Sequence, residues 1–332
     1  RRVARKRAGK VMRRKDRLDR FGITALTVFA ALMAFNQIVV KVVNQGFQPI
    51  FFAGLRSAIA MVCLVLWLKL RGRPAVLDRA ILGPGIAIGA VFAAEFLFLF
   101  LSLDLTTVTH TAVILYSMPV WLAIGAHFLL PGERITPARG LGLGLAFAGV
   151  AVAILYPGAA GGGGGAGGGA LPSGGPSLPG DLLALLAAMC WAGIALLARG
   201  SRLRSVPAET QLLWQLAVSA VILLVVSPLF GPLIRDLQPI HYLGLIFQAT
   251  VIAAAGFLTW LWLLSVYPAA SVASFSFLSP VFGVAFGWLL LGEEVGPGVL
   301  VAAVLVAAGI VLINRPRPAG SGVTSREAGR AG

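Results

Sequence analysis

The sequence predicts an all-α integral membrane protein whose ten transmembrane helices form two inverted five-helix repeats. Its composition is the first observation: 58% of the residues are hydrophobic and only 12% are charged, whereas an ordinary globular domain carries about 25% charged residues. The second is that ten apolar segments are each long enough to cross a membrane. The third is a glycine-rich stretch that divides these segments into five and five.

A helix that rises about 1.5 Å per residue needs about 20 apolar residues to cross roughly 30 Å of hydrocarbon. Helices are expected because a backbone in lipid must satisfy its own hydrogen bonds, and the alternating pattern of a membrane barrel is missing from the sequence. The predicted spans are 21–43, 49–70, 79–101, 106–130, 137–156, 180–199, 208–230, 240–263, 268–291 and 295–314.

Charge and glycine content divide the chain further. The predicted parts are a basic cytoplasmic tail (1–20), a first repeat (21–156), a glycine-rich linker (157–179), a second repeat (180–314) and a second cytoplasmic tail (315–332). Eleven of the 27 Lys and Arg residues fall in the first tail, and most of the others fall in loops on the same side. The positive-inside rule therefore places both termini in the cytoplasm, in what we expect to be a bacterial inner membrane.

The two halves share a motif with a central proline. "YSMP" at 116–119 aligns with "FLSP" at 277–280, so Pro119 and Pro280 lie 161 residues apart. Because five is an odd number of crossings, the second half enters the membrane from the opposite side, which is a feature of secondary transporters. A proline removes a helical hydrogen bond, so both helices should kink there. The alternative is that prolines are simply common in membrane helices.

The same segments carry a family resemblance. "LTTVTHTAVILYSMPVWLAIGAHFLLPGERIT" and "AASVASFSFLSPVFGVAFGWLLLGEEV" resemble the fourth and ninth spans of the EamA branch of the drug/metabolite transporter superfamily. Lys41, followed by Pro49 and Arg56, resembles the first-to-second span pattern of that family. The resemblance implies a ten-helix fold in which spans one to four and six to nine enclose a central cavity. It also implies efflux of amino acids or related small metabolites.

Polar groups inside membrane spans are costly, so each is a candidate site residue. Asn36, Arg56 and Glu95 lie at a similar depth, about 10 Å below the outer ends of the first three spans. Tyr116 and Trp191 are aromatic residues near mid-depth that could line a cavity or pack against lipid. The full set of candidate substrate-binding residues is Asn36, Arg56, Glu95, Tyr116, Trp191, Gln215 and Gln248.

Two readings of these polar residues stay open. Arg56 and Glu95 form either a charge pair or proton-linked switch near the cavity, in which Arg56 could also bind a substrate carboxylate, or a purely structural ion pair. Gln215 and Gln248 either bind substrate or join neighbouring helices, at about 0.6 kcal/mol each.

Other polar residues are expected to be peripheral. Lys41 should extend to the outer interface, and Glu133, Glu293 and Glu294 should be solvated or terminate helices. His110 and His127 are too far apart along span four to share a metal, so no metal site is predicted.

The expected partners are a small-molecule substrate and the lipid bilayer. No nucleic acid is expected, because no basic face with interleaved aromatic residues occurs outside the tail. The sequence has no nucleotide-binding or hydrolase motif, so we expect neither a cofactor nor an enzyme. A non-transporting membrane scaffold or sensor is the alternative function, and the oligomeric state stays open, a homodimer included.

Overall fold

The computed structural model describes residues 19–72, 78–130, 135–155, 175–267, 275 and 278–313. Over these ranges the chain is helical, and its only extended pairing is an isolated bridge between Phe47 and Ile234. The α-helices are α1 (Arg20–Val43), α2 (Pro49–Leu70), α3 (Arg79–Leu105), α4 (Val108–Leu115), α5 (Met118–Leu129), α6 (Pro137–Leu155), α7 (Leu178–Gly200), α8 (Ala208–Val226), α9 (Pro239–Phe247), α10 (Phe257–Val266), α12 (Leu278–Leu291) and α13 (Pro297–Ile313).

The described ranges also include two short 3₁₀ turns and one π-helical segment. The turns are η2 (Arg202–Ser205) and η3 (Ser227–Phe230), and the π-helix is η4 (Gln248–Gly256), which joins α9 to α10. Of the helices in the described ranges, seven are long and apolar enough to cross a membrane by length and composition. Three shorter apolar helices, Arg139–Leu155, Leu278–Leu291 and Pro297–Ile313, accompany them.

Proline residues and capping side chains mark the starts of α1 and α2 in the sequence. Pro49 stands in the first turn of α2, where a missing N–H costs nothing, and the Gln48 side chain accepts a hydrogen bond from Phe51 N at 2.5 Å. The Asp19 carboxylate caps α1 by accepting from Gly22 N at 2.8 Å. These caps satisfy amide groups that a helix leaves unpaired at its start.

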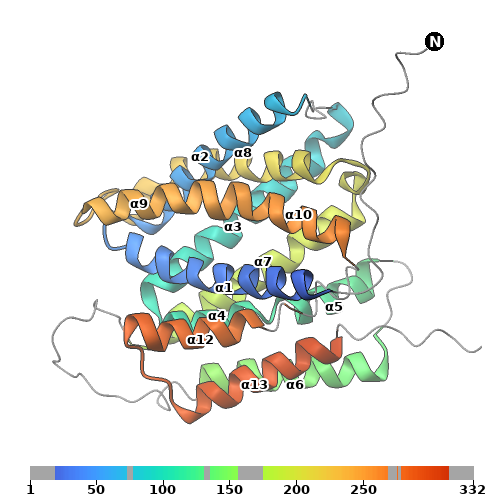
Figure 1. Ribbon diagram of the computed structural model, residues 1–332, viewed down its shortest axis with the longest axis vertical. Helices are drawn as coiled ribbons and strands as arrows, with labels where there is room; N and C mark the ends of the chain where they lie inside the picture. Colours follow the sequence, from blue (N-terminus) through green and yellow to red (C-terminus); the bar gives the residue numbers. More distant parts are fainter. Residues whose placement is uncertain are drawn as a thin grey trace, which may run out of the picture.

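Helices from the two predicted repeats interleave. In Figure 1, α1 lies beside α12, while α6 and α13 lie together at one edge of the bundle. In addition, α7 packs against α3, α4 and α5, and α8 packs against α2 and α3. The α6–α13 contact is so close that a Cβ atom on Gly309 would lie 2.6 Å from the Gly142 carbonyl oxygen, which leaves no room for a side chain at this position. Each predicted half therefore buries its helices largely against the other half.

The predicted fourth span is interrupted one turn before its proline. α4 ends at Leu115 and α5 begins at Met118, with Pro119 in the first turn of α5. The break matches the lack of a donor at Pro119, which leaves the Leu115 carbonyl without its helical partner. In the predicted ninth span, Pro280 stands in the first turn of α12, and the residues at 276–277 lie outside the described ranges.

Polar contacts join the halves at both ends of the bundle. The bundle has two ends, which we name here. The linker end is the one at which α3 ends and at which α4 and α7 begin. The tail end is the one at which α1 begins and α10 ends. At the linker end, Thr106 Oγ1 donates to Asp181 Oδ1 at 2.8 Å. At the tail end, Tyr267 Oη donates to Asp19 Oδ1 at 2.8 Å. In each case, a carboxylate at a helix start meets a hydroxyl that follows a helix in the other half.

Candidate functional site

The break between α4 and α5 places Tyr116 among polar groups from both predicted repeats. Its hydroxyl lies near the polar side chains of Gln37 on α1 and Ser279 on α12. Its ring meets that of Trp191 on α7 edge to face, with centroids 5.9 Å apart. Tyr116 is buried and Trp191 is half-buried. Two of the predicted site residues, Tyr116 and Trp191, are therefore in contact.

Arg56 is a buried cation that lies against aromatic rings. Its side chain is on α2, 4% exposed, and its guanidinium carbon lies 4.1 Å from the centre of the Phe96 ring. Within the described residues, its Nε and Nη1 atoms have no hydrogen-bond partner. A desolvated guanidinium stacked on a ring keeps its planar donors free for a carboxylate.

Glu95 lies on α3, one residue before Phe96, and is also buried. Its carboxylate is close enough to interact electrostatically with Arg56 on α2 and with Cys190 on α7. Among the described side chains, no hydrogen bond or ion pair within 4.0 Å joins Glu95 to Arg56. Because Trp191 follows Cys190, α7 lies beside both Glu95 and Tyr116 and connects the two polar groups of the site.

Three amide side chains add acceptors. Gln248, at the start of the π-helix η4, donates from Nε2 to the Asn36 carbonyl oxygen at 3.0 Å. The side-chain oxygens of Asn36, Gln37 and Gln248 are buried and have no hydrogen-bond partner among the described residues. Buried polar atoms without partners are rare, so each calls for an explanation. Gln215 is buried on α8, and no contact with another site candidate is described for it.

Lys41 does not extend to the interface as expected. It is 8% exposed, and its Nζ donates to the carbonyl oxygens of Thr106 at 2.5 Å and Leu103 at 3.3 Å. These carbonyls close the end of α3, where a cation is favoured by the helix dipole. The helix end offers the ammonium group better ligands than the interface would.

Glu293 is buried too, contrary to a solvated role. α12 ends at a left-handed glycine, Gly292 with φ of 66°, and the chain turns back toward α4. The Glu293 carboxylate then accepts from Val108 N at 2.7 Å, Thr109 N at 2.9 Å and Thr109 Oγ1 at 2.6 Å. It therefore caps the first turn of α4 from the other predicted repeat.

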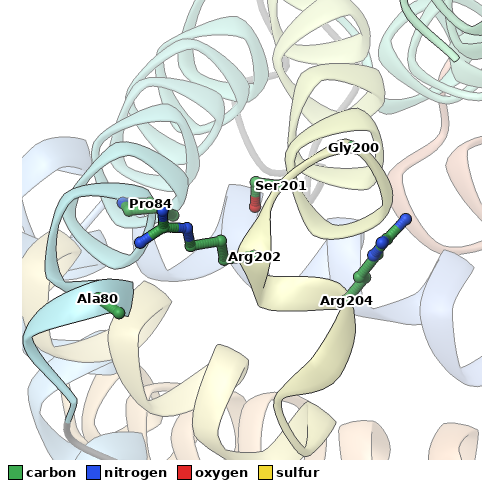
Figure 2. Close-up of a pocket in the computed structure, with 6 residues that line it drawn as sticks. All are labelled: Ala80, Pro84, Gly200, Ser201, Arg202 and Arg204. Carbon is green, nitrogen blue, oxygen red and sulfur yellow. The ribbon is translucent and has the colours of Figure 1, made fainter.

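The tail end carries a basic cavity of about 550 Å³ between α3 and the end of α7. Figure 2 shows Arg202 reaching across to α3 beside Pro84, whereas Arg204 extends on the other side of η2. Ser201 and Gly200 complete the wall on the α7 side. Two guanidinium groups therefore lie at the tail end of the bundle.

The structure places beside polar groups four residues that were not among the predicted site residues: Gln37, Asp181, Ser279 and Glu293. Of these, only Glu293 was expected at the end of a helix. Gln37 was not predicted because the neighbouring Asn36 was chosen as the polar candidate of that span. Ser279 was not predicted because the sequence argument there concerned only Pro280. Asp181 and Glu293 stand at span ends, where a carboxylate usually meets water. A prior hint was available only for Glu293, whose Gly-Glu pair recurs as Gly132-Glu133 in the first half.

Comparison with known proteins identifies the family. The family model described as "EamA-like transporter family" matches residues 20–155 and 178–315, which is most of the chain in two copies. The chain belongs to the EamA-like transporter family. The predicted membership of the drug/metabolite transporter superfamily is thus confirmed, and this EamA chain is an integral membrane protein and a membrane transporter.

Three relatives match this EamA transporter over nearly its whole length. It is 24% identical to "Uncharacterized transporter YoaV" of Bacillus subtilis, over 88% of this chain and 94% of the relative. It is 30% identical to "Uncharacterized protein PA1977" of Pseudomonas aeruginosa (89% and 95%), and 27% identical to "Probable amino-acid metabolite efflux pump" of Escherichia coli (91% and 95%). A solved structure titled "Crystal structure of protein" shares the fold, with a TM-score of 0.60 and 20% identity over 88% of this chain and 95% of that one.

Proposed function

We propose that this transporter exports amino acids or related small metabolites by alternating access through a central cavity between two inverted repeats. The observation that carries the proposal is that, among the described residues, buried Arg56 has unused donors while Asn36, Gln37 and Gln248 have unused acceptors. An amino acid presents the complementary groups, since its carboxylate accepts from a guanidinium and its ammonium donates to amide oxygens. The E. coli relative named an amino-acid metabolite efflux pump supports the same substrate class.

The proposal includes ten membrane-spanning helices in two halves of opposite orientation, 21–156 and 180–314. The contacts at the two ends support it. Asp181 and Thr106 at the linker end correspond to Asp19 and Tyr267 at the tail end, with sequence offsets of 162 and 161 residues. The helix pairs follow the same rule, since α1 packs on α12 as α7 packs on α4 and α5. An inverted repeat generates such pairs from one ancestral contact.

Both termini are proposed to be cytoplasmic, in the inner membrane, with the linker end facing outward. The arginines around the cavity in Figure 2 support this orientation, since basic residues concentrate on the cytoplasmic side. Reporter fusions within 157–179 and at the N-terminus should report opposite sides of the membrane. The same side for both would rule out the inverted arrangement.

Flux in proteoliposomes tests the transport proposal. The purified chain should carry a mixture of tritiated amino acids across the vesicle membrane with saturable kinetics, whereas empty vesicles should not. A scaffold or sensor, the alternative function, would show no saturable flux over a broad panel of amino acids and related metabolites. Competition by unlabelled amino acids would then identify the preferred side chain.

Within this site we propose that Glu95 and Arg56 act as an electrostatic switch, in which a substrate carboxylate replaces Glu95 as the counter-charge of Arg56. Glu95→Gln removes the charge that competes with the substrate carboxylate for Arg56, so apparent affinity for amino acids should rise by about tenfold. The exposed neighbour of Glu293 provides the control, and Glu294→Gln should transport as the unmodified protein does. Unchanged kinetics in Glu95→Gln would rule out the switch and leave Glu95 with a structural role.

A further inference from the structure

The basic cavity at the tail end is not used by the proposed substrate site. It has a volume of about 550 Å³, and its wall on the α3 side consists of Ala80 and Pro84. The opposite wall is the turn between α7 and η2, where Ser201, Arg202 and Arg204 contribute side chains. Figure 2 shows the two arginines on opposite sides of η2, with Arg202 directed toward α3. The cavity is therefore formed by both predicted repeats.

The guanidinium groups of this cavity are not used by other parts of the protein. No ion pair or side-chain hydrogen bond of Arg202 or Arg204 is found within the described ranges, and both side chains are exposed. At the linker end, by contrast, charged groups are paired: Arg235 lies 2.7 Å from Asp104, and His110 lies 3.0 Å from Asp181. The planar donors of Arg202 and Arg204 are therefore available to a ligand.

The stretches of chain that form the cavity carry an excess of positive charge. Over 78–84 and 199–209, the basic residues are Arg79, Arg199, Arg202 and Arg204, and the acidic residues are Asp78 and Glu209. The Asp78 carboxylate accepts a hydrogen bond from Ala80 N at 3.1 Å, so it caps the start of α3. Four positive side chains against two negative ones favour an anionic ligand.

The position of the cavity along the helices places it at the membrane surface. α3 has 27 residues, so it is about 40 Å long and extends beyond the hydrocarbon core, which is roughly 30 Å thick. Ala80 and Pro84 lie in the first two turns of α3, and Gly200 is the last residue of α7. These residues therefore lie at the level of the phospholipid headgroups and not among the acyl chains.

Apolar side chains flank the cavity on both sides. Leu82 and Ile86 on α3 are exposed, and so is Phe128 at the end of α5. The end of α5 reaches the cavity wall, because a Cβ atom on Gly200 would lie 3.2 Å from Leu130 Cδ2. A ligand with an anionic head and apolar tails can contact both the arginines and these side chains. Free phosphate would contact the arginines alone, so the surroundings favour a lipid.

We propose that this cavity binds the phosphate group of an anionic phospholipid from the membrane leaflet at the tail end. Arg202 holds the phosphate between α3 and η2, since its planar fork matches two phosphate oxygens. Arg204 supplies a second positive charge at the rim, and basic pockets between transmembrane helices suit lipid headgroups. The bound lipid joins α3 to the turn between α7 and η2, so it stabilises the fold. The inference does not depend on the transported substrate.

Thermal unfolding in detergent micelles, followed by tryptophan fluorescence, tests this site. Dioleoyl phosphatidylglycerol at saturating concentration should raise the unfolding midpoint by about 3–5 °C, whereas zwitterionic dioleoyl phosphatidylcholine should not. The double variant Arg202→Gln/Arg204→Gln should lose this shift. Arg71→Gln is the matched control, since Arg71 is also exposed at the tail end but lies outside the cavity, beside the Trp67 ring. It should keep the shift.

The outcomes separate this site from general effects of charge. A shift that persists in the double variant, an equal shift with phosphatidylcholine, or a loss in Arg71→Gln as well would overturn the inference. Inorganic phosphate or glycerol 3-phosphate that reproduces the shift would overturn the assignment to a lipid. Native mass spectrometry counts bound lipid directly, and the double variant should bind phosphatidylglycerol about tenfold more weakly. Neither measurement requires flux, so failure of this inference is distinguishable from failure of the transport proposal.

Discussion

Glu293→Ala should destabilise the protein by about 2–4 kcal/mol, because it removes a helix cap and a charged hydrogen-bond acceptor at once. The carboxylate is 3% exposed and accepts three hydrogen bonds. Without it, the amide groups of Val108 and Thr109 lose their partner in a buried position. Thermal unfolding in detergent, followed by tryptophan fluorescence, measures the effect.

The neighbouring glutamate is a matched control for this prediction. Glu294 is exposed, so Glu294→Ala changes the same charge and the same volume without removing a buried contact. Its unfolding midpoint should stay close to that of the unmodified protein. Glu293→Gln keeps one acceptor oxygen and should fall between the two. Equal shifts for both alanine variants would contradict the proposed cap.

Arg56→Lys should reduce amino-acid flux at low substrate concentration by about 10- to 100-fold, the loss expected when a charge-assisted two-pronged bond is removed. Lysine keeps the charge, but it has no planar fork for a carboxylate and cannot stack flat on Phe96. The concentration dependence of initial rates measures the change. We expect the apparent KM to rise more than the maximal rate falls.

Arg235→Lys is the corresponding control. Arg235 also holds a carboxylate with two nitrogens, but its side chain is 38% exposed, and exposed pairs contribute little. Its substitution should leave flux nearly unchanged. Similar losses in both variants would indicate a general sensitivity to arginine replacement, and the assignment of Arg56 to the substrate carboxylate would be wrong.

Local chemistry made much of the fold predictable. The second span was predicted at 49–70 and α2 covers Pro49–Leu70, because Pro49 fixes the start and the apolar run fixes the length. The third helix continues to Leu105, four residues beyond its predicted end at 101. Of the predicted ninth span, the described helix covers Leu278–Leu291, and positions 268–274 lie outside the described residues.

The site was less predictable because it depends on which helices meet. Tyr116 and Trp191 were candidates as aromatic residues near mid-depth, but their contact requires α4 and α7 to pack together. The sequence QATVIAAAG of the π-helix η4 contains no feature that distinguishes it from an ordinary apolar α-helix. Asp181 and Glu293 gain their roles from partners 71 and 184 positions away, which periodicity within a span cannot reveal.

The cap on α4 also bears on how the protein is made. During translation the first half of a chain emerges from the ribosome before the second half is made, and domains generally fold in that order. The backbone amides of Val108 and Thr109 have no access to the Glu293 carboxylate until Glu293 is synthesised, 185 and 184 residues later. During biogenesis the start of α4 therefore stays open to water or to other proteins of the insertion machinery, and the first half completes its structure only when nearly the whole polypeptide has entered the bilayer.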